Sequence, residues 1–152
     1  MSETERRAFT CVYPGPVRAI YTPVELFFGE YDASTAYTVN ALWDTGAMIS
    51  VVTPQVVERL GLQKIDIIPI TGANSTNNVD VVLVSCILPN KIAIEKLRVA
   101  VCTVDPSTEM LIGMDLISLM DFAITNGGEQ TQFSFAIPPF KGRIDFEKQN
   151  DG

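Results

Sequence analysis

A carboxylate directly follows an apolar run at Asp44-Thr45-Gly46, which comes after Ala41-Leu42-Trp43. An ionised, unpaired carboxylate at the end of a buried strand is costly, so it must be neutralised, hydrogen-bonded or kept for chemistry. The Thr45 hydroxyl can bond to main chain, and Gly46 lets the backbone turn tightly beside the carboxylate. The triplet therefore predicts a tight loop. That loop is either an active-site loop or an ordinary turn between two strands, since Asp and Gly also form turns.

A second apolar segment, Leu111-Ile112, ends at Gly113 and is followed by residues that suit a short helix. In this order, the two segments resemble the retropepsin-like aspartic proteases, a single-domain family with retroviral and bacterial members. The resemblance extends over residues 24–137 and is nearest to the bacterial members. It implies an all-β fold, namely a closed or partly open antiparallel β-barrel with one or two short helices, and it implies the hydrolysis of peptide bonds.

The chain contains a single Asp-Thr-Gly triplet and is too short for two lobes that would each carry one. Aspartic proteolysis requires two carboxyl groups about 3 Å apart, because one must stay protonated as the acid while the other acts as the base. We therefore expect a homodimer in which Asp44 meets its symmetry mate at a twofold axis. Activity should depend on protein concentration and follow a bell-shaped pH profile that favours mildly acidic pH.

The resemblance assigns the reaction to the triplet itself. Asp44 would activate the water and protonate the leaving amine, while Thr45 would lock the two active-site loops together across the dimer axis. Gly46 would bring its backbone close to both the carboxylate and the substrate. Further positions are expected to contact the peptide substrate, two in the cleft and two in a flap, namely Ala47, Met48, Gly72 and Ala73.

The flap is expected within a small polar segment, residues 72–78, that has the composition of a hairpin tip. In the family, a flap closes over the substrate at this place in the chain order, and by resemblance it spans residues 70–80. Such a lid would exclude water and add the peptide like an extra strand. The composition alone fits an ordinary surface hairpin equally well.

The segment after Leu111-Ile112 carries two supporting residues. By resemblance, Gly113 lies at a close crossing behind the active-site loop and is structural. Asp115 either caps the short helix or contacts the substrate directly, and Asp often occupies cap positions. Viral members carry acidic residues where this chain has Met48 and Ile49, so those substrate contacts do not carry over.

The apolar pattern predicts mostly strands, with a helix at residues 54–60 that Thr53 can cap and Gly61 ends. Strands are expected at residues 24–29, 37–43, 65–71, 79–88, 92–102, 122–125 and 132–137. The last two strands are separated by a turn at residues 126–128.

Composition excludes several function classes. With no histidine, the chain cannot hold a self-contained Ser-His-Asp or Cys-His system, and histidine-based zinc sites are absent as well. A net charge of −7 without a basic patch argues against nucleic acid. We expect no metal, no cofactor and no membrane partner. The start of the chain lacks a secretory pattern, which indicates the cytoplasm. Three cysteines without paired spacing suit reduced thiols, with Cys86 and Cys102 in the core.

The sequence suggests an N-terminal segment at residues 1–22, a protease domain at 23–140 and a loosely ordered tail at 141–152. Two other hypotheses stay open. The first is a catalytically silent retropepsin-like module that dimerises or binds peptides, since a fold does not fix a function. The second is a small β-barrel that binds an apolar ligand, with Asp44 in a simple turn.

Overall fold

A computed structural model describes residues 5–149, and strands dominate it. The expected ends of the N-terminal segment and of the tail, residues 1–4 and 150–152, lie outside the described residues. The strands are β1 Arg7–Val12, β2 Tyr21–Phe27, β3 Tyr37–Trp43, β4 Val51–Val52, β5 Lys64–Thr71, β6 Thr76–Ile87, β7 Ala93–Val101, β8 Met110–Ile112, β9 Asp121–Thr125 and β10 Gln132–Ile137. The helices are α1 Pro54–Leu60 and α2 Met114–Ile117, with one 3₁₀ turn, η1 Gly127–Glu129. The predicted all-β fold with short helices is confirmed.

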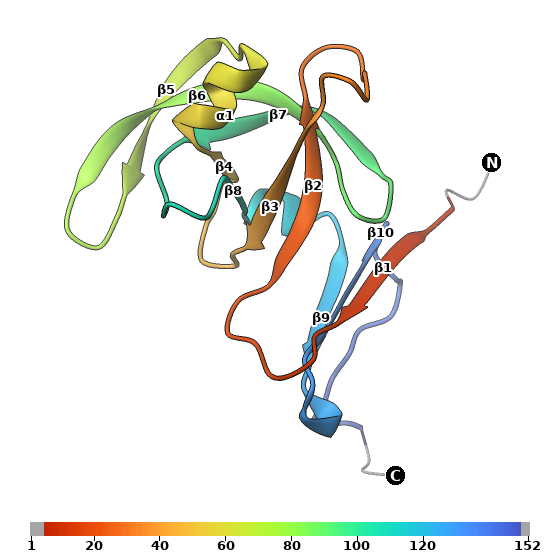
Figure 1. Cartoon of the computed structure of the whole chain (residues 1–152). Helices are drawn as coiled ribbons and strands as arrows, with labels where there is room; N and C mark the ends of the chain where they lie inside the picture. The colour runs from red at the N-terminus through yellow and green to blue at the C-terminus, as the bar shows by residue number, and fades with distance from the viewer. Residues whose placement is uncertain (1–4, 150–152) are drawn as a thin grey trace.

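The larger sheet closes into a ring (Figure 1). Its strand order is β2-β3-β8-β4-β7-β6-β5, and β2 also pairs with β6, so that six strands form the ring and β5 lies outside it. The expected closed or partly open antiparallel barrel needs one correction, because β3 pairs with β8 in parallel and β4 pairs with β7 in parallel. The result is a ring of mixed pairings and not a regular barrel.

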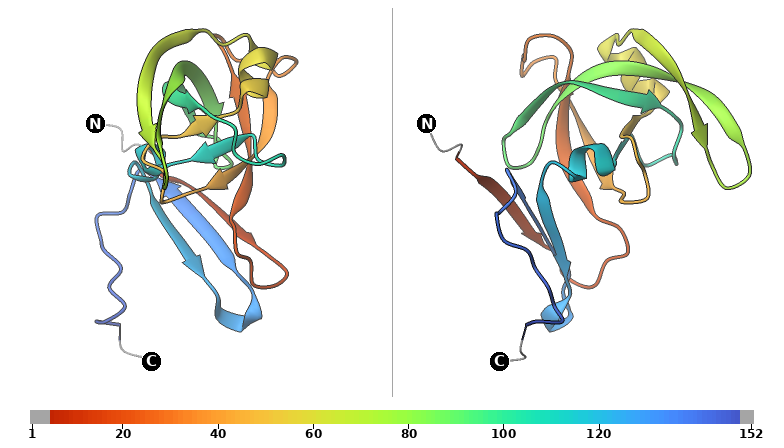
Figure 2. Two further views of the ribbon diagram at one scale, coloured as in Figure 1. Left: turned by 90° about the vertical axis from the view of Figure 1, so that its left-hand side faces the viewer. Right: turned by 180° about the vertical axis from the view of Figure 1, so that it is seen from behind.

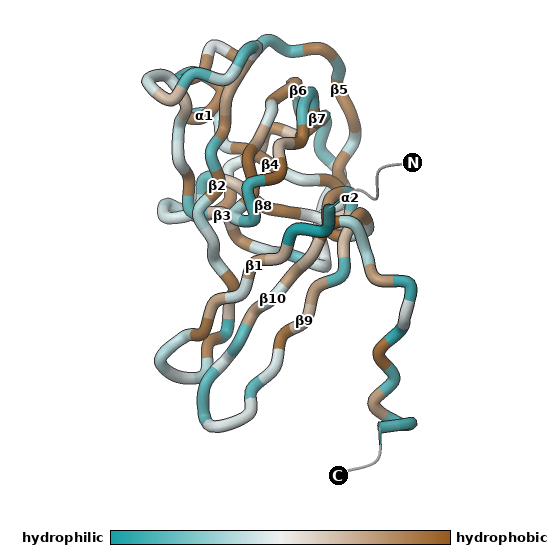
Figure 3. The backbone as a smooth tube through the Cα atoms, turned by 90° about the vertical axis from the view of Figure 1, so that its right-hand side faces the viewer, coloured by the Kyte–Doolittle hydropathy of each residue, from teal (hydrophilic) through white to brown (hydrophobic). Residues whose placement is uncertain are grey.

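A smaller antiparallel sheet, in the order β1-β10-β9, lies below the ring (Figure 2). The sequence pattern did not predict β1, which is the first strand of the chain and pairs with β10 along its whole length. β1 and β9 are the two edges of this sheet. Beyond β10, residues 141–149 form no helix or strand and leave the body of the protein (Figure 3).

An aromatic cluster joins the two sheets beneath the end of β3. The Trp43 ring lies 4.9 Å from the Phe133 ring and 5.1 Å from the Phe135 ring, measured between centroids. Trp43 is buried, and its indole N–H donates to the Thr22 hydroxyl at 2.9 Å. Because large aromatic side chains contribute strongly to core stability, this cluster fixes the residue that precedes Asp44.

Helix α1 has the predicted bounds, and its C-terminal glycine, Gly61, adopts a left-handed conformation with φ of 63°. The predicted cap is wrong in one respect. Thr53 occupies the N-cap position, but its buried hydroxyl makes no capping hydrogen bond. Neither α1 nor any other helix in the described part of the chain is long and apolar enough to cross a membrane.

Candidate active site

The Asp44 carboxylate is held on a tight loop, residues 44–50, which we call the candidate active-site loop. The Asp44 N–H donates to the Ile112 carbonyl at 2.8 Å, because β3 and β8 run in parallel up to this point. The Gly46 N–H donates to Asp44 Oδ1 at 2.8 Å. A Cβ atom at position 46 would lie 3.2 Å from that same oxygen, so glycine suits the close approach. Backbone groups therefore orient the carboxylate.

Gly113 lies where a second segment crosses behind this loop. The N–H of its neighbour Met114 donates to the Ala47 carbonyl at 2.7 Å. A Cβ atom at position 113 would lie 2.8 Å from the Ala47 oxygen and 2.9 Å from the Ile49 carbonyl carbon. Both obstacles are backbone atoms, which cannot rotate away as a side chain can. The crossing is this close only because residue 113 has no side chain.

Ser50 links the loop to helix α2. It is fully buried, its N–H donates to Asp115 Oδ2 at 2.9 Å, and its hydroxyl donates to Asp115 Oδ1 at 2.7 Å. The same hydroxyl accepts from the Gly113 N–H at 3.0 Å. Gly113, and not Asp115, occupies the N-cap position of α2, so the predicted cap position is wrong, although Asp115 Oδ1 accepts the Leu116 N–H in the first turn at 2.9 Å. The Asp115 carboxylate instead anchors the loop, a contact that the sequence did not reveal.

A hollow of about 230 Å³ opens beside the loop. Its walls are residues 17–20 before β2, then Trp43, Asp44 and Thr45, then Phe122 and Ile124 of β9. The sequence placed Asp44 and Thr45 together but gave no sign that residues 17–20 or β9 join them. A larger hollow of about 420 Å³ lies among β6, β7 and residues 28–30 after β2, and none of the candidate site residues line it.

Residues 31–116, more than half of the chain, match the aspartyl protease family. The chain belongs to this family. Among solved structures, the fold is similar to a retropepsin-like aspartic protease from Rickettsia conorii, with a TM-score of 0.57 and 15% identity over 90% of this chain and 98% of that one. It is also similar to the EIAV protease complexed with the inhibitor HBY-793, with a TM-score of 0.50 and 20% identity over 66% of this chain and 86% of that one. No curated protein matches the sequence. The retropepsin-like resemblance is thus confirmed.

In this aspartyl protease family member, the remaining predicted site residues lie at different places relative to Asp44. The Ala47 N–H donates to the Asp44 carbonyl at 3.2 Å, whereas Gly72 and Ala73 lie between β5 and β6. Met48 is 87% exposed and Ala47 is half-buried. Gly72 and Ala73 form the tip of the β5–β6 hairpin, where the Gly72 N–H donates to the Ser75 carbonyl at 2.8 Å. The hairpin projects from the body on the side of the candidate active-site loop (Figures 1 and 2). Within residues 5–149, no hydrogen bond joins its tip to that loop.

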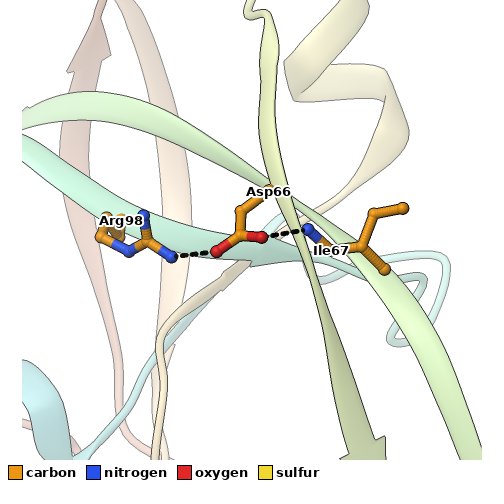
Figure 4. Close-up of polar contacts among 3 residues, drawn as sticks. All are labelled: Asp66, Ile67 and Arg98. Atoms are coloured by element: carbon orange, nitrogen blue, oxygen red, sulfur yellow. Dashed lines mark hydrogen bonds and ion pairs between the residues drawn. The ribbon is translucent and has the colours of Figure 1, made fainter.

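The base of this hairpin is tied to β7 across β6. Arg98 donates to Asp66 Oδ2 at 2.8 Å, and the Ile67 N–H donates to Asp66 Oδ1 at 2.8 Å (Figure 4). The Arg98 guanidinium, followed by the Ile67 N–H, holds the pKa of the Asp66 carboxyl below its ordinary value. The contact fixes β5 at the point where the hairpin leaves the ring.

The metal-ligating and thiol side chains within residues 5–149 are the other candidates for chemistry. Among residues 5–149, no three His, Cys, Asp or Glu side chains gather closely enough to hold a metal ion. Cys86 is fully buried, and burial raises the pKa of its thiol to about 12. Cys11 and Cys102 are half-buried, and burial raises the pKa of the Cys102 thiol as well. The raised pKa makes the Cys86 and Cys102 thiols poor nucleophiles at neutral pH.

Proposed function

We propose that the chain is an aspartic endopeptidase that acts as a homodimer, with Asp44 of each copy holding one water between them. The observation that carries the proposal is the Asp44 carboxylate itself. The Asp44 N–H donates to the Ile112 carbonyl, and Asp44 Oδ1 accepts from the Gly46 N–H. The Asp44 side chain borders an open hollow. A fixed carboxylate at an open site suits a general acid or base. The family match and the fold support the same reaction.

The chemistry requires two carboxyl groups that share one proton, because two charges about 3 Å apart cannot both persist. The ionised carboxylate takes a proton from the water as the water oxygen attacks the peptide carbonyl carbon. The protonated carboxyl group gives its proton to the carbonyl oxygen, which yields a tetrahedral diol. As the C–N bond breaks, one diol hydroxyl returns its proton to the ionised carboxylate and becomes the new carbonyl, while the protonated carboxyl group gives its proton to the leaving nitrogen, which restores the singly protonated Asp44 pair. Peptide and water are consumed, and a carboxylic acid and an amine are released.

The edge of β9 supports a twofold dimer. An edge strand exposes unpaired backbone groups that can pair with another chain. β9 is such an edge, and its residues Phe122 and Ile124 line the same hollow as Asp44 and Thr45. A second copy that docks against β9 would border this hollow and bring the two Asp44 loops together. Thr45 is exposed at this face and is available to bond across the axis.

The substrate in this proposal is an extended peptide that lies between the candidate active-site loop and the β5–β6 hairpin. Gly72 and Ala73 would offer backbone groups to the peptide, as strand addition requires. Exposed Met48 would contact its side chains along the cleft. Closure of the hairpin would exclude water from the Asp44 pair, which strengthens electrostatic interactions there.

The test is cleavage of a mixed peptide library between acidic and neutral pH at several protein concentrations. Wild type is compared with Asp44→Asn and with Glu58→Gln, a matched charge removal on the exposed face of α1. We expect cutting by wild type and Glu58→Gln, no cutting by Asp44→Asn, and a specific activity that falls on dilution. If a folded, dimeric wild type cuts nothing, the chain is the catalytically silent module. If activity survives Asp44→Asn, the Asp44 pair is not the catalyst.

A further inference from the structure

The hollow beside Asp44 contains one cationic residue among mostly apolar ones. Of its nine lining residues, six are apolar, and only Arg18 and Asp44 are ionisable. Once a bound peptide covers them, the apolar walls would strengthen an ion pair formed there, because they lower the local dielectric constant. A positively charged side chain therefore borders the same small space as the proposed catalytic carboxylate.

The segment that carries Arg18 is fixed on both sides. The Val17 N–H donates to the Thr131 hydroxyl at 3.0 Å, and the Ile20 carbonyl accepts from the Trp43 N–H at 2.9 Å. Ile20 is also buried in the core. Position 18 is thus held at the wall of the hollow by its neighbours, and no contact of the Arg18 side chain is needed to keep the segment there.

Arg18 itself is exposed and makes no ion pair within the described residues. The chain has 18 acidic and 11 basic residues, so carboxylates are not scarce. A guanidinium that serves structure is usually paired with a carboxylate or stacked on an aromatic ring. An unpaired one beside a reaction site is available to a ligand.

A second copy offers few acidic partners from the two segments that build the site. The candidate active-site loop has apolar Met48 and Ile49 after its triplet. Its one carboxylate, Asp44, belongs to the proposed pair. Asp115 is already bonded through both oxygens to Ser50. On β9, the Asp121 carboxylate already accepts the Phe140 N–H at 2.7 Å. A bound peptide is a further source of a carboxylate next to Arg18.

We propose that Arg18 is a specificity-determining residue that binds an Asp or Glu side chain of the peptide, close to the bond that is cut. This inference rests on the proposed protease function. A guanidinium binds a carboxylate through two parallel hydrogen bonds, which an amide of the same size cannot match in charge. We expect a preference for Glu over Gln of about tenfold to a hundredfold in kcat/KM at one substrate position.

The test uses the best-cleaved library peptide, rebuilt with Glu, Gln or Lys at each position from four residues before the cut to four after it. Values of kcat/KM are measured for wild type, Arg18→Gln, Arg18→Glu and a control, Arg143→Gln, in the exposed tail. Wild type and the control should prefer Glu at one position. Arg18→Gln should lose that preference while cleaving the Gln peptide as before, and Arg18→Glu should favour Lys.

Other outcomes overturn the inference without touching the protease function. Wild type could cleave Glu and Gln peptides equally at every position. Alternatively, Arg18→Gln could lose activity on all peptides and regain it at higher protein concentration, which would assign Arg18 to the dimer contact. If wild type cleaves nothing, the affinity of Glu and Gln peptides for the Asp44→Asn protein is measured instead and tests the role of Arg18. A Glu preference in affinity that Arg18→Gln abolishes supports the inference, and equal affinities refute it.

Discussion

Asp44 belongs to the candidate active-site loop and Asp115 binds that loop from helix α2, and their carboxylates have different partners. Both oxygens of Asp115 accept hydrogen bonds from Ser50, and Oδ1 also accepts from the Leu116 N–H. Asp44 accepts a backbone bond at Oδ1 and lies at the wall of the hollow. A carboxylate bonded at both oxygens orients its neighbours, whereas one with an accessible oxygen can exchange protons. In the proposed function, Asp115 therefore supports the loop and Asp44 carries the chemistry.

The crossing at Gly113 predicts a strong effect of one methyl group. We expect Gly113→Ala to lower the free energy of unfolding by about 1–3 kcal/mol, because the new Cβ overlaps backbone atoms of Ala47 and Ile49. Urea unfolding measures the change. Gly15→Ala is the control, since a Cβ there would meet nothing within 4 Å. Equal stability of the two variants would contradict the close crossing.

The buried thiol of Cys86 gives a second residue-scale prediction. Its pKa rises from the ordinary 9.0 to about 12, chiefly through burial, so little thiolate exists near pH 8. We expect iodoacetamide to leave Cys86 unlabelled in the native protein and to label it in denaturant, as read by peptide mass spectrometry. Because the folded pKa is raised, the thiol's contribution to stability is present below pH 9 and is lost as pH rises towards about 12. Rapid native labelling at Cys86 would show that this part of the core opens.

Sequence reasoning named those residues of the candidate site that carry a local signal, and it missed the residues that packing brings there. Asp44 stood out because a carboxylate followed an apolar run, and Gly113 because it ended another. The hydrogen bond between Ser50 and Asp115 joins residues 65 positions apart, and no local sequence pattern links the two. Arg18 reaches the hollow through the anchoring of its neighbours to Thr131 and Trp43, which no local pattern encodes.

The β5–β6 hairpin is the element that would close over a bound peptide, and its base carries an ion pair. Asp66 on β5 is bonded to Arg98 on β7, with β6 between them. Both side chains are about half exposed, so the pair contributes little to overall stability. Its effect is local, because it limits how far β5 can separate from the ring.

This pair predicts a pH-dependent signal at Ile67. The pKa of Asp66 is lowered from its ordinary 3.8, so the contact is present above pH 3.8 and is lost as pH falls through the lowered value. We expect the Ile67 amide resonance to titrate with a midpoint below 3.8, since that amide donates to Asp66. Arg98→Gln should raise the midpoint and speed hydrogen exchange of the β5 amides at neutral pH.

Arg143→Gln is the matched control for this titration, because it removes one positive charge from the exposed tail. Its Ile67 midpoint should equal that of wild type. If Arg98→Gln also leaves the midpoint unchanged, the ion pair does not form in solution. If exchange of the β5 amides is unaffected as well, the hairpin base is held by its strand pairing alone.

At the scale of elements, periodicity predicted those segments whose own residues alternate or whose ends are marked. Helix α1 begins at Pro54 and ends before Gly61, and strand β10 has its predicted bounds. β1 was missed because it is an edge strand with a mostly exposed pattern and pairs only with β10, far away in sequence. The parallel β3–β8 pairing could not be predicted either, since β8 has only three residues.

The whole molecule consists of a closed ring and a small open sheet, joined by aromatic packing around Trp43. The ring leaves only β5 as an outer strand, and β5 belongs to the hairpin that we propose closes over the peptide. The open sheet has two further edges, β1 and β9. Only β9 borders the hollow beside Asp44. Closure of the ring and the position of the hollow together favour β9 as the face for a second copy.

This asymmetry between the two edges predicts different effects of the same substitution. Ile124 on β9 is 47% exposed and Val12 on β1 is 54% exposed, so Lys at either position should be tolerated by the folded monomer. At β9, the new charges would face the partner across an apolar contact and oppose burial. We expect Ile124→Lys to raise the dimer Kd at least about tenfold, which corresponds to about 1.4 kcal/mol, and Val12→Lys to leave it unchanged.

Analytical ultracentrifugation over a dilution series measures both constants, and peptide cleavage is followed at the same concentrations. If the dimer forms at β9, the activity of Ile124→Lys should fall at low protein concentration and recover at higher concentration, where the dimer is populated again. The reason is that the proposed Asp44 pair exists only in the dimer. The opposite result, a weakened dimer in Val12→Lys alone, would move the contact to β1. Since β1 lines no part of the hollow, the Asp44 loops would then have to meet through another surface, and the two-copy site would need a different geometry.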